Sequence, residues 1–469
     1  MTENDSHETT EQMLQAPEHE QRNFLLIALH MIIFRVGWIF KTESVIIPAF
    51  VDTISGAGWV RGCLPVLARL GQSIPPLYFA GTLRRAKRKH WVMAFLLLAM
   101  SVPFGVLSLV WFFLLERNAD GGITPPGWLP FVFLALYGVY FVIYGLGQQT
   151  FGTVQGKLIR PTRRGRLLLA YSLGSTPPAC LCAFFILSRW LALPDGGFGA
   201  IFAFVAVCFF ISGLVAMLLR ETPDEVEQDE AGHVSCGDNE DADGSESKCG
   251  PLCATWATLR SDMNLALLLL IAALFGGQII ILPHYQALAR QELGLSGTHL
   301  MTWVIIQNMS VGLFSVVVGL VADHRGYRLT LRGCLIGVAL APLFAIAMIQ
   351  MPGDWGIRLY PILYVFLAII PMALRAFLNY TLEICEHDQQ PRYLSTLQLG
   401  AAAPFIISPF VGRLVDLFGF TPIFISASAL TFLAAGLTFG LREPRLPEPH
   451  WSDASVLADE EDSVSGFYT

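Results

Sequence analysis

Ionisable side chains lie deep inside several of the long apolar stretches of this 469-residue chain. Arg35 and Glu43 lie in the first stretch, Arg69 in the second and Arg375 in a later one. A charge in the hydrocarbon zone of a bilayer is costly unless partners or water shield it, so these residues are candidates for function. Three arginines against one acid favour an anionic or zwitterionic ligand. Glu43 is the candidate for a group that exchanges a proton as its access to water changes.

Uncharged polar residues extend this set. Asn379 follows Arg375 by one helical turn and therefore lies on the same face. Gln72 follows Arg69 in the second stretch. A further helix face is formed by Tyr137, Tyr140, Tyr144 and Gln148. Because a tyrosine ring offers both apolar area and a hydroxyl, Tyr140 and Tyr144 suit the lining of a solute-binding cavity.

Each of these residues also has a purely structural interpretation. The arginines can form ion pairs or extend toward a membrane interface. Glu43 can be a charge at a helix end, and the tyrosines can pack between helices with their hydroxyls bonded. The sequence leaves these alternatives open.

The elements that carry the polar residues have the length of membrane spans. The chain is 54% hydrophobic and 14% charged, with a mean hydropathy of +0.55, whereas a soluble domain of this size needs far more charge. A transmembrane helix needs about 20 mostly apolar residues. Twelve such stretches begin near Phe24, Ala57, Trp91, Trp128, Leu167, Phe198, Met263, Thr298, Leu329, Gly356, Arg392 and Phe420. The apolar runs do not alternate, so they predict helices and not barrel strands.

The charge distribution divides the chain into five parts. We expect an all-α membrane protein with an N-terminal tail (1–23), a six-helix bundle (24–219), an acidic linker (220–261), a second six-helix bundle (262–441) and a C-terminal tail (442–469). Basic residues gather in alternate loops, at 84–89, 157–166 and 325–332. By the positive-inside rule, both tails and the linker are then cytoplasmic. We expect a monomer that crosses a bacterial inner membrane many times.

Short patterns recur in the same order in both halves. The paired positions are Pro48 with Pro283, Gly81 with Gly319, and Arg166 with Arg392. Three matches in order indicate two parallel six-helix repeats.

The pairing also compares polar positions between the halves. It sets Glu43 against Gln278, and Arg69 against Gln307, which is followed by Asn308. A neutral amide opposite a charge predicts a two-fold cavity that is asymmetric toward its ligand. Gln307 and Asn308 are adjacent, so their side chains point in different directions.

The strongest local pattern is Gly319-x-Val321-x-Asp323-x-x-Gly326-x-Arg328. It is similar to a loop motif of the major facilitator superfamily, which the chain resembles from about Phe24 to Leu441. The resemblance implies two pseudo-symmetric six-helix bundles and secondary active transport by alternating access. The equivalent loop of the first half departs from the motif, because arginines stand where the family has an acid and a glycine.

The motif also has a direct physical interpretation. Gly319 would let two helices approach closely. Gly326 would provide a turn that few other residues can adopt. Asp323 and Arg328 would belong to a charge cluster that latches one conformation. The alternative is a structural turn with charges that only set topology.

Other activities lack sequence support. We find no phosphate-binding GxxxxGK[ST] loop and no HExxH, and the basic runs fit topology and not nucleic-acid binding. The nine cysteines do not resemble a disulfide framework. Zinc binding by Cys236, Cys249, Cys253 and His233 in the linker is an unspecific possibility, and we expect no metal or cofactor. We therefore expect a proton-coupled transporter of a small solute and not an enzyme; the alternative is a membrane receptor or sensor.

Overall fold

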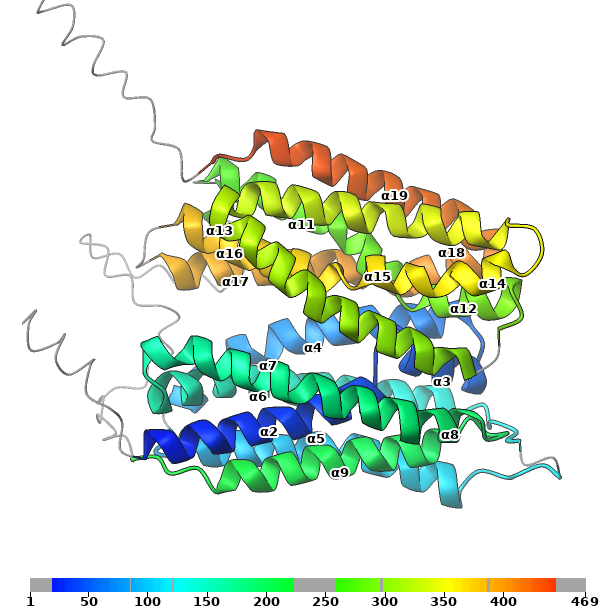
Figure 1. The fold of residues 1–469 in the computed structure, drawn as a ribbon, viewed down its shortest axis with the longest axis horizontal. Helices are drawn as coiled ribbons and strands as arrows, with labels where there is room; N and C mark the ends of the chain where they lie inside the picture. The colour runs from blue at the N-terminus through cyan, green and yellow to red at the C-terminus, as the bar shows by residue number, and fades with distance from the viewer. Residues whose placement is uncertain are drawn as a thin grey trace, which may run out of the picture.

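The computed structural model describes residues 19–84, 86–119, 122–222, 258–260, 262–295, 298–385 and 389–443 (Figure 1). Helices account for most of these residues. Their regular structure includes no named strand, and a single isolated bridge pairs Arg117 with Ile123. The predicted all-helical fold is confirmed.

The helices fall into two groups that lie side by side in Figure 1. The first group comprises α2 (Glu20–Phe40), α3 (Ile46–Ile54), α4 (Gly58–Arg84), α5 (Lys89–Phe113), α6 (Leu129–Leu158), α7 (Pro161–Cys182), the π-helical turn η1 (Ala183–Leu187), α8 (Ser188–Leu191) and α9 (Phe198–Met217). We call this group the first half. Its helices run roughly along the long axis of the molecule, as do those of the second half.

The second half begins after the linker. It comprises α11 (Met263–Ile281), α12 (His284–Glu292), α13 (Thr298–Ile349), α14 (Trp355–Leu359), η2 (Tyr360–Ile362), α15 (Leu363–Leu367), α16 (Ile370–Ile384), α17 (Gln390–Ala402), η3 (Ala403–Ile407), α18 (Ser408–Phe418), α19 (Phe420–Leu437) and η4 (Thr438–Gly440). The described chain starts with α2 and ends after η4 at the same end of the molecule (Figure 1). We call this the tail end, and the end with α3, α12 and α18 the far end.

Ten helices of the described part of the chain are long and apolar enough to cross a membrane. The protein is therefore a multi-pass membrane protein, but the count of twelve spans stays a prediction. Two features explain the difference. The stretches that begin near Thr298 and Leu329 are two helices that share the label α13, because they are joined only by a non-helical turn at Gly326, and the two are counted together. The second stretch, α4, contains two deep arginines and three prolines and is not among the ten.

The bend in α13 confirms the turn predicted at Gly326. Its φ of 81° and ψ of 164° lie in a region that is essentially restricted to glycine. A side chain at this position would strain the backbone, so the bend depends on the glycine.

The paired prolines mark the same break in each half. The first stretch divides into α2 and the nine-residue α3, with Pro48 in the first turn of α3. The seventh stretch divides into α11 and the nine-residue α12, with Pro283 at the N-cap of α12. Proline fits these positions because the first helical turn needs no N–H from it. The short helices α3 and α12 contact each other at the far end.

A buried carboxylate anchors the start of the linker to the tail end of the first half. Glu221 accepts a hydrogen bond of 2.8 Å from the backbone N–H of His90 and lies 2.9 Å from His90 Nδ1. Lys157 Nζ donates to its other oxygen at 2.8 Å. Burial alone raises the pKa of Glu221, but the hydrogen bonds from His90 and Lys157 outweigh it and hold the pKa below its ordinary value.

This pKa has a definite consequence for stability. A carboxyl group whose pKa is lowered by folding stabilises the protein above its unfolded-state pKa, about 4.3 for glutamate, and loses that contribution as the pH falls through the folded-state pKa. We expect Glu221→Gln to lower the melting temperature by a few degrees at neutral pH. The difference from wild type should shrink below about pH 4.3. Thermal denaturation against pH measures this, with the exposed Glu116→Gln as control; a difference constant with pH would contradict it.

Candidate functional site

At the far end, the two halves meet backbone to backbone. The Cβ of any larger residue at Gly58 in α4 would collide with the carbonyl oxygen of Gly412 in α18, and the reverse collision would occur at Gly412. A Cβ at Gly62 would similarly collide with the carbonyl oxygen of Ser408. Small residues at these positions allow α4 and α18 to pack without intervening side chains. The far end is closed in this structure.

A charge cluster joins the halves beside this contact. Asp416 of α18 accepts hydrogen bonds of 2.8 and 2.9 Å from the backbone N–H of Gly58, the first residue of α4. Arg61 is ion-paired to Asp52 of α3 and lies 3.8 Å from Asp416. A carboxylate at a helix N-terminus satisfies a free N–H and complements the helix dipole. Asp416 therefore acts as a cap that the second half supplies to the first.

The loss of this cap has a measurable result. Asp416→Ala should cost about 1 kcal/mol, the usual value of an N-cap, so the ratio of closed to open far ends should fall about fivefold. Labelling of an Ala57→Cys background with an impermeant maleimide reports the opening. Asp354→Ala, another exposed aspartate of the far end, is the matched control, and equal labelling in the two variants would contradict the role of Asp416.

In the middle of the molecule, predicted polar residues from the two halves come together. Arg35 of α2 donates a hydrogen bond of 3.2 Å from Nη2 to Asn308 Oδ1 in α13. Ser44, in the break between α2 and α3, donates to Gln307. The adjacent Gln307 and Asn308 therefore both reach the first half.

Arg69 also faces the second half. Its guanidinium lies 5.5 Å from the ring centroid of Phe405 in η3, within the range of a cation–π contact. It interacts electrostatically with Glu43 and Tyr144. Gln72 is half-buried one turn further along α4, where its backbone packs against Gly145 of α6.

Glu43 has a partner that the sequence analysis did not predict. Besides its electrostatic interaction with Arg69, Glu43 forms an ion pair with Lys41, whose Nζ lies 2.9 Å from Glu43 Oε1. The Lys41 side chain is 0% exposed, whereas that of Glu43 is 31% exposed. Residues two apart do not face each other on a helix. They meet here because α2 ends at Phe40 and the chain turns before α3.

The tyrosine face of α6 divides into two environments. Tyr140 is fully buried, and its ring stacks on Tyr144 and Phe209, so it does not line an open cavity as predicted. Tyr144 is half-buried and accepts a hydrogen bond from Gln148. Tyr144 and Gln148 line a cavity of about 40 Å³, which is large enough for water.

Gln278 lies apart from these residues, inside the second half, so its assignment to the substrate site stays a prediction that this structure does not support. It is fully buried within the second half and donates to Ala427 O at 3.2 Å and to Thr431 Oγ1 at 3.0 Å. The hydroxyl of Tyr285 donates to Gln278 Oε1 at 3.4 Å. The amide holds α11 against α19, because a buried polar side chain must find hydrogen-bond partners.

The α16 residues lie on the second-half side. Arg375 is exposed and interacts electrostatically with Arg35 and with Tyr171 of α7. Asn379 is half-buried one turn later. The two halves thus contribute arginines to the same region.

The loop motif in α13 has a different structural role from the one predicted for Gly319. A Cβ at Gly319 would meet nothing within 4 Å, so this glycine does not bring two helices together here. Arg328 donates to the carbonyl oxygens of Thr438 at 3.3 Å and Phe439 at 2.8 Å. It therefore caps the C-terminal end of the last helix with positive charge. A latch role for Asp323 stays a prediction.

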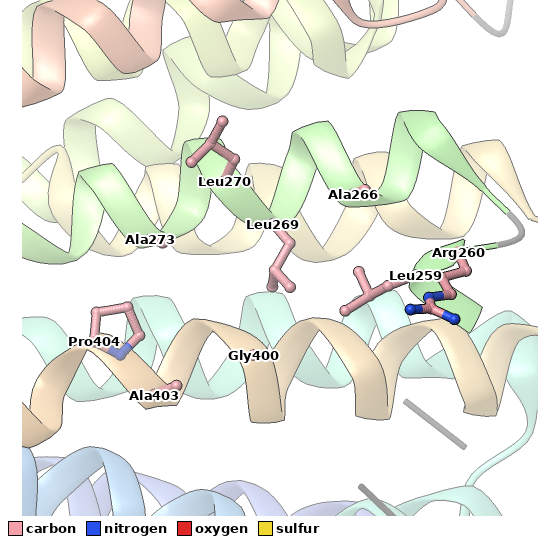
Figure 2. A pocket seen from close by; sticks show the side chains of 9 residues that line it. All are labelled: Leu259, Arg260, Ala266, Leu269, Leu270, Ala273, Gly400, Ala403 and Pro404. Carbon is pink, nitrogen blue, oxygen red and sulfur yellow. The ribbon is translucent and has the colours of Figure 1, made fainter. Parts of the chain in front are cut away.

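A larger cavity of about 520 Å³ lies between α11 and α17 (Figure 2). Figure 2 shows Leu269 pointing from α11 toward α17 and Arg260 at the end where α11 begins. The lining is apolar apart from Arg260, and its described residues include none of the predicted substrate residues. The candidate site is therefore the group of polar residues where the two halves meet, which we call the polar layer. It comprises Arg35, Lys41, Glu43, Ser44, Arg69, Gln307, Asn308 and Arg375.

The described cysteines carry free thiols: Cys63, Cys180, Cys182, Cys208, Cys334 and Cys385. Within the described ranges, the structure brings together no group of three or more metal-ligating side chains. The three linker cysteines and His233 lie outside the described residues, so the zinc hypothesis is not tested.

Comparisons with known proteins agree with this architecture. Residues 267–458 match the sequence profile of the Major Facilitator Superfamily. No curated protein sequence matches the chain. Among solved structures, the nucleoside transporter NupG (D323A mutant) superposes with a TM-score of 0.65 at 11% identity, covering 90% of this chain and 100% of NupG.

Two further structures have the same fold. A bacterial homologue of the human lysosomal transporter Spinster, in an inward-facing and unoccupied conformation, has a TM-score of 0.64 at 13% identity over 92% of this chain and 100% of that one. A D-xylose–proton symporter has a TM-score of 0.62 at 14% identity over 89% and 98%. At these identities the similarity shows the fold alone.

Proposed function

We propose that this chain, which has the major facilitator fold and matches that superfamily's sequence profile over its second half, is a proton-coupled secondary transporter of a small anionic or zwitterionic solute. Alternating access would expose the polar layer to each side of the membrane in turn. The closed far end would be the external side, since the basic loops favour a cytoplasmic tail end. The structure would then correspond to an inward-facing state.

The observation that carries the proposal is the polar layer between the halves. Arg35 and Arg69 of the first half reach Asn308 and Phe405 of the second. Transporters of this design bind solutes near the bilayer midplane between their two repeats. Residues that bridge the halves can change contacts when the halves rock, which couples binding to access.

The charge of the layer supports an anionic or zwitterionic solute. Arg35, Lys41, Arg69 and Arg375 contribute positive charge, and Glu43 is the acid paired with one of them. Unpaired positive charge in a low-dielectric region stabilises an anion that enters it. The excess therefore favours a solute with a carboxylate or comparable group.

Glu43 is the proposed coupling residue. Its partial exposure gives it access to protons, and its ion pair with Lys41 ties its charge to a buried cation. Proteins with a similar fold include a D-xylose–proton symporter and proton-dependent oligopeptide transporters. Proton coupling is a property of those proteins, and it supports the proposal that this chain is coupled to protons as well.

A ligand screen on the purified protein is the first experiment. Ligands that bind the folded state raise the melting temperature, so thermal shifts with anions, sugars and hydrophobic drugs identify the solute class. We expect anions or zwitterions to give the largest shifts. Counterflow of the best ligand in proteoliposomes then distinguishes a transporter from a receptor. Binding without counterflow would favour the receptor alternative over our proposal.

A further inference from the structure

Lys41 occupies an aromatic cage inside the first half. Its Nζ lies 3.4 Å from the ring centroid of Trp38, 4.6 Å from that of Tyr140 and 5.1 Å from that of Phe141. These distances are within the range of cation–π attraction. The side chain is fully buried, so the ammonium group is held in place by its surroundings.

The rings alone do not replace the water that this ammonium lacks. A buried charge needs a partner of opposite sign, and Glu43 supplies it at 2.9 Å. Glu43 is the more exposed member of the pair. Its carboxylate is therefore the member of the pair that solvent, and with it a solute, can reach.

The other groups around Glu43 are cationic or neutral. Arg69 faces it from α4, and the tyrosines of α6 also interact with it electrostatically. Those tyrosines are Tyr137, Tyr140 and Tyr144. If the carboxylate of Glu43 moves away, its place is left beside Lys41 and Arg69 with no acid to balance them. An anion of carboxylate size would restore that balance.

We propose that Lys41 binds a carboxylate group of the solute, and that the Glu43 carboxylate occupies the position of that group when no solute is bound. On binding, the solute carboxylate accepts the hydrogen bond from Lys41 Nζ, and the displaced Glu43 carboxylate binds one proton (as hydronium or buffer acid) from the solution on the open side. The solute brings one negative charge and the proton one positive charge, so the net charge of the site is unchanged. This inference rests on the proposed function and specifies its solute group and coupling step.

The exchange makes solute and proton binding mutually dependent. The solute competes with ionised Glu43 for Lys41, whereas protonated Glu43 does not compete. Each ligand therefore strengthens the binding of the other by the same factor. This linkage is the requirement for moving the two in the same direction.

Chemical rescue by acetate tests this role of Lys41 directly. In purified full-length Glu43→Ala, the caged ammonium lacks its partner and acetate can take the vacated place. We expect sodium acetate to raise the melting temperature by several degrees in a saturable manner, relative to sodium chloride of equal ionic strength. The double variant Lys41→Met/Glu43→Ala should show no such shift. No acetate-specific shift in the single variant, or an equal shift in the double variant, would overturn the proposal.

The conservative variant Glu43→Gln tests the proton step and does not depend on recovery of Glu43→Ala. In wild type, acetate affinity from thermal shifts should rise about tenfold for each unit of pH decrease, as expected for one linked proton. In Glu43→Gln it should not change with pH. Equal pH dependence in both proteins would overturn the step. Because these measurements report binding and not flux, a failure of transport alone would contradict only the proposed function.

Discussion

Glu43→Gln is expected to abolish accumulation of the solute driven by a pH gradient. With one proton moved per solute anion, a gradient of one pH unit supports about tenfold accumulation, because one unit is worth about 1.4 kcal/mol. A glutamine cannot carry the proton, so the accumulation ratio should fall to one. Uptake of labelled solute into proteoliposomes with an imposed pH gradient measures this ratio.

Exchange of labelled for unlabelled solute should persist in the same variant, since exchange needs binding and movement of the halves but no net proton transfer. The exposed Glu292→Gln is the matched control and should accumulate solute as wild type does. Unchanged accumulation in Glu43→Gln would remove Glu43 from the coupling step. Loss of both accumulation and exchange would indicate that Glu43 is needed for binding or folding instead.

Gly412→Leu is expected to reduce transport to background. Any Cβ at this position collides with the carbonyl oxygen of Gly58, and a backbone atom cannot move aside as a side chain can. Overpacking of this kind costs about 1–3 kcal/mol or more, and each 1.4 kcal/mol shifts a two-state population about tenfold. The far end should therefore stay open, and the solute should not reach the tail end.

Counterflow in proteoliposomes measures the loss, and maleimide labelling of the Ala57→Cys background reports the open far end. Gly436→Leu is the matched control, because Gly436 lies on a helix where a Cβ meets nothing within 4 Å. It should transport normally. Normal transport by Gly412→Leu would show that closure of α4 on α18 is not part of the cycle.

Local sequence patterns predicted much of the fold. Apolar length revealed the membrane helices, and the paired Pro48 and Pro283 marked the breaks that produce α3 and α12. The rarity of φ near 81° for other residues made Gly326 a recognisable bend. These features depend on residues close together in the chain, so the sequence contains their cause directly.

The site was predictable only where a single residue is unusual in itself. Arg35 and Arg69 stand out because charges are rare at membrane depth, and they do reach the second half. Lys41 was missed as the partner of Glu43, because helical spacing separates residues two apart. The end of α2 at Phe40 removes that restriction.

Long-range pairing explains the remaining differences. Asp416 caps α4 from 358 residues away, and Gly412 meets Gly58 across a similarly long stretch of sequence, so neither pattern is local. Gln278 was assigned by repeat alignment with Glu43. The alignment matched its position but not its surroundings, in which Ala427 and Thr431 of α19 accept its hydrogen bonds.

Concentrative uptake by the reconstituted wild-type protein tests the central claim most directly. The measurement is the internal concentration of the ligand identified by thermal shift, in proteoliposomes with an imposed pH gradient and no membrane potential. The account predicts accumulation above the external concentration that collapses when a protonophore dissipates the gradient. Binding of the ligand with no accumulation and no counterflow would contradict it.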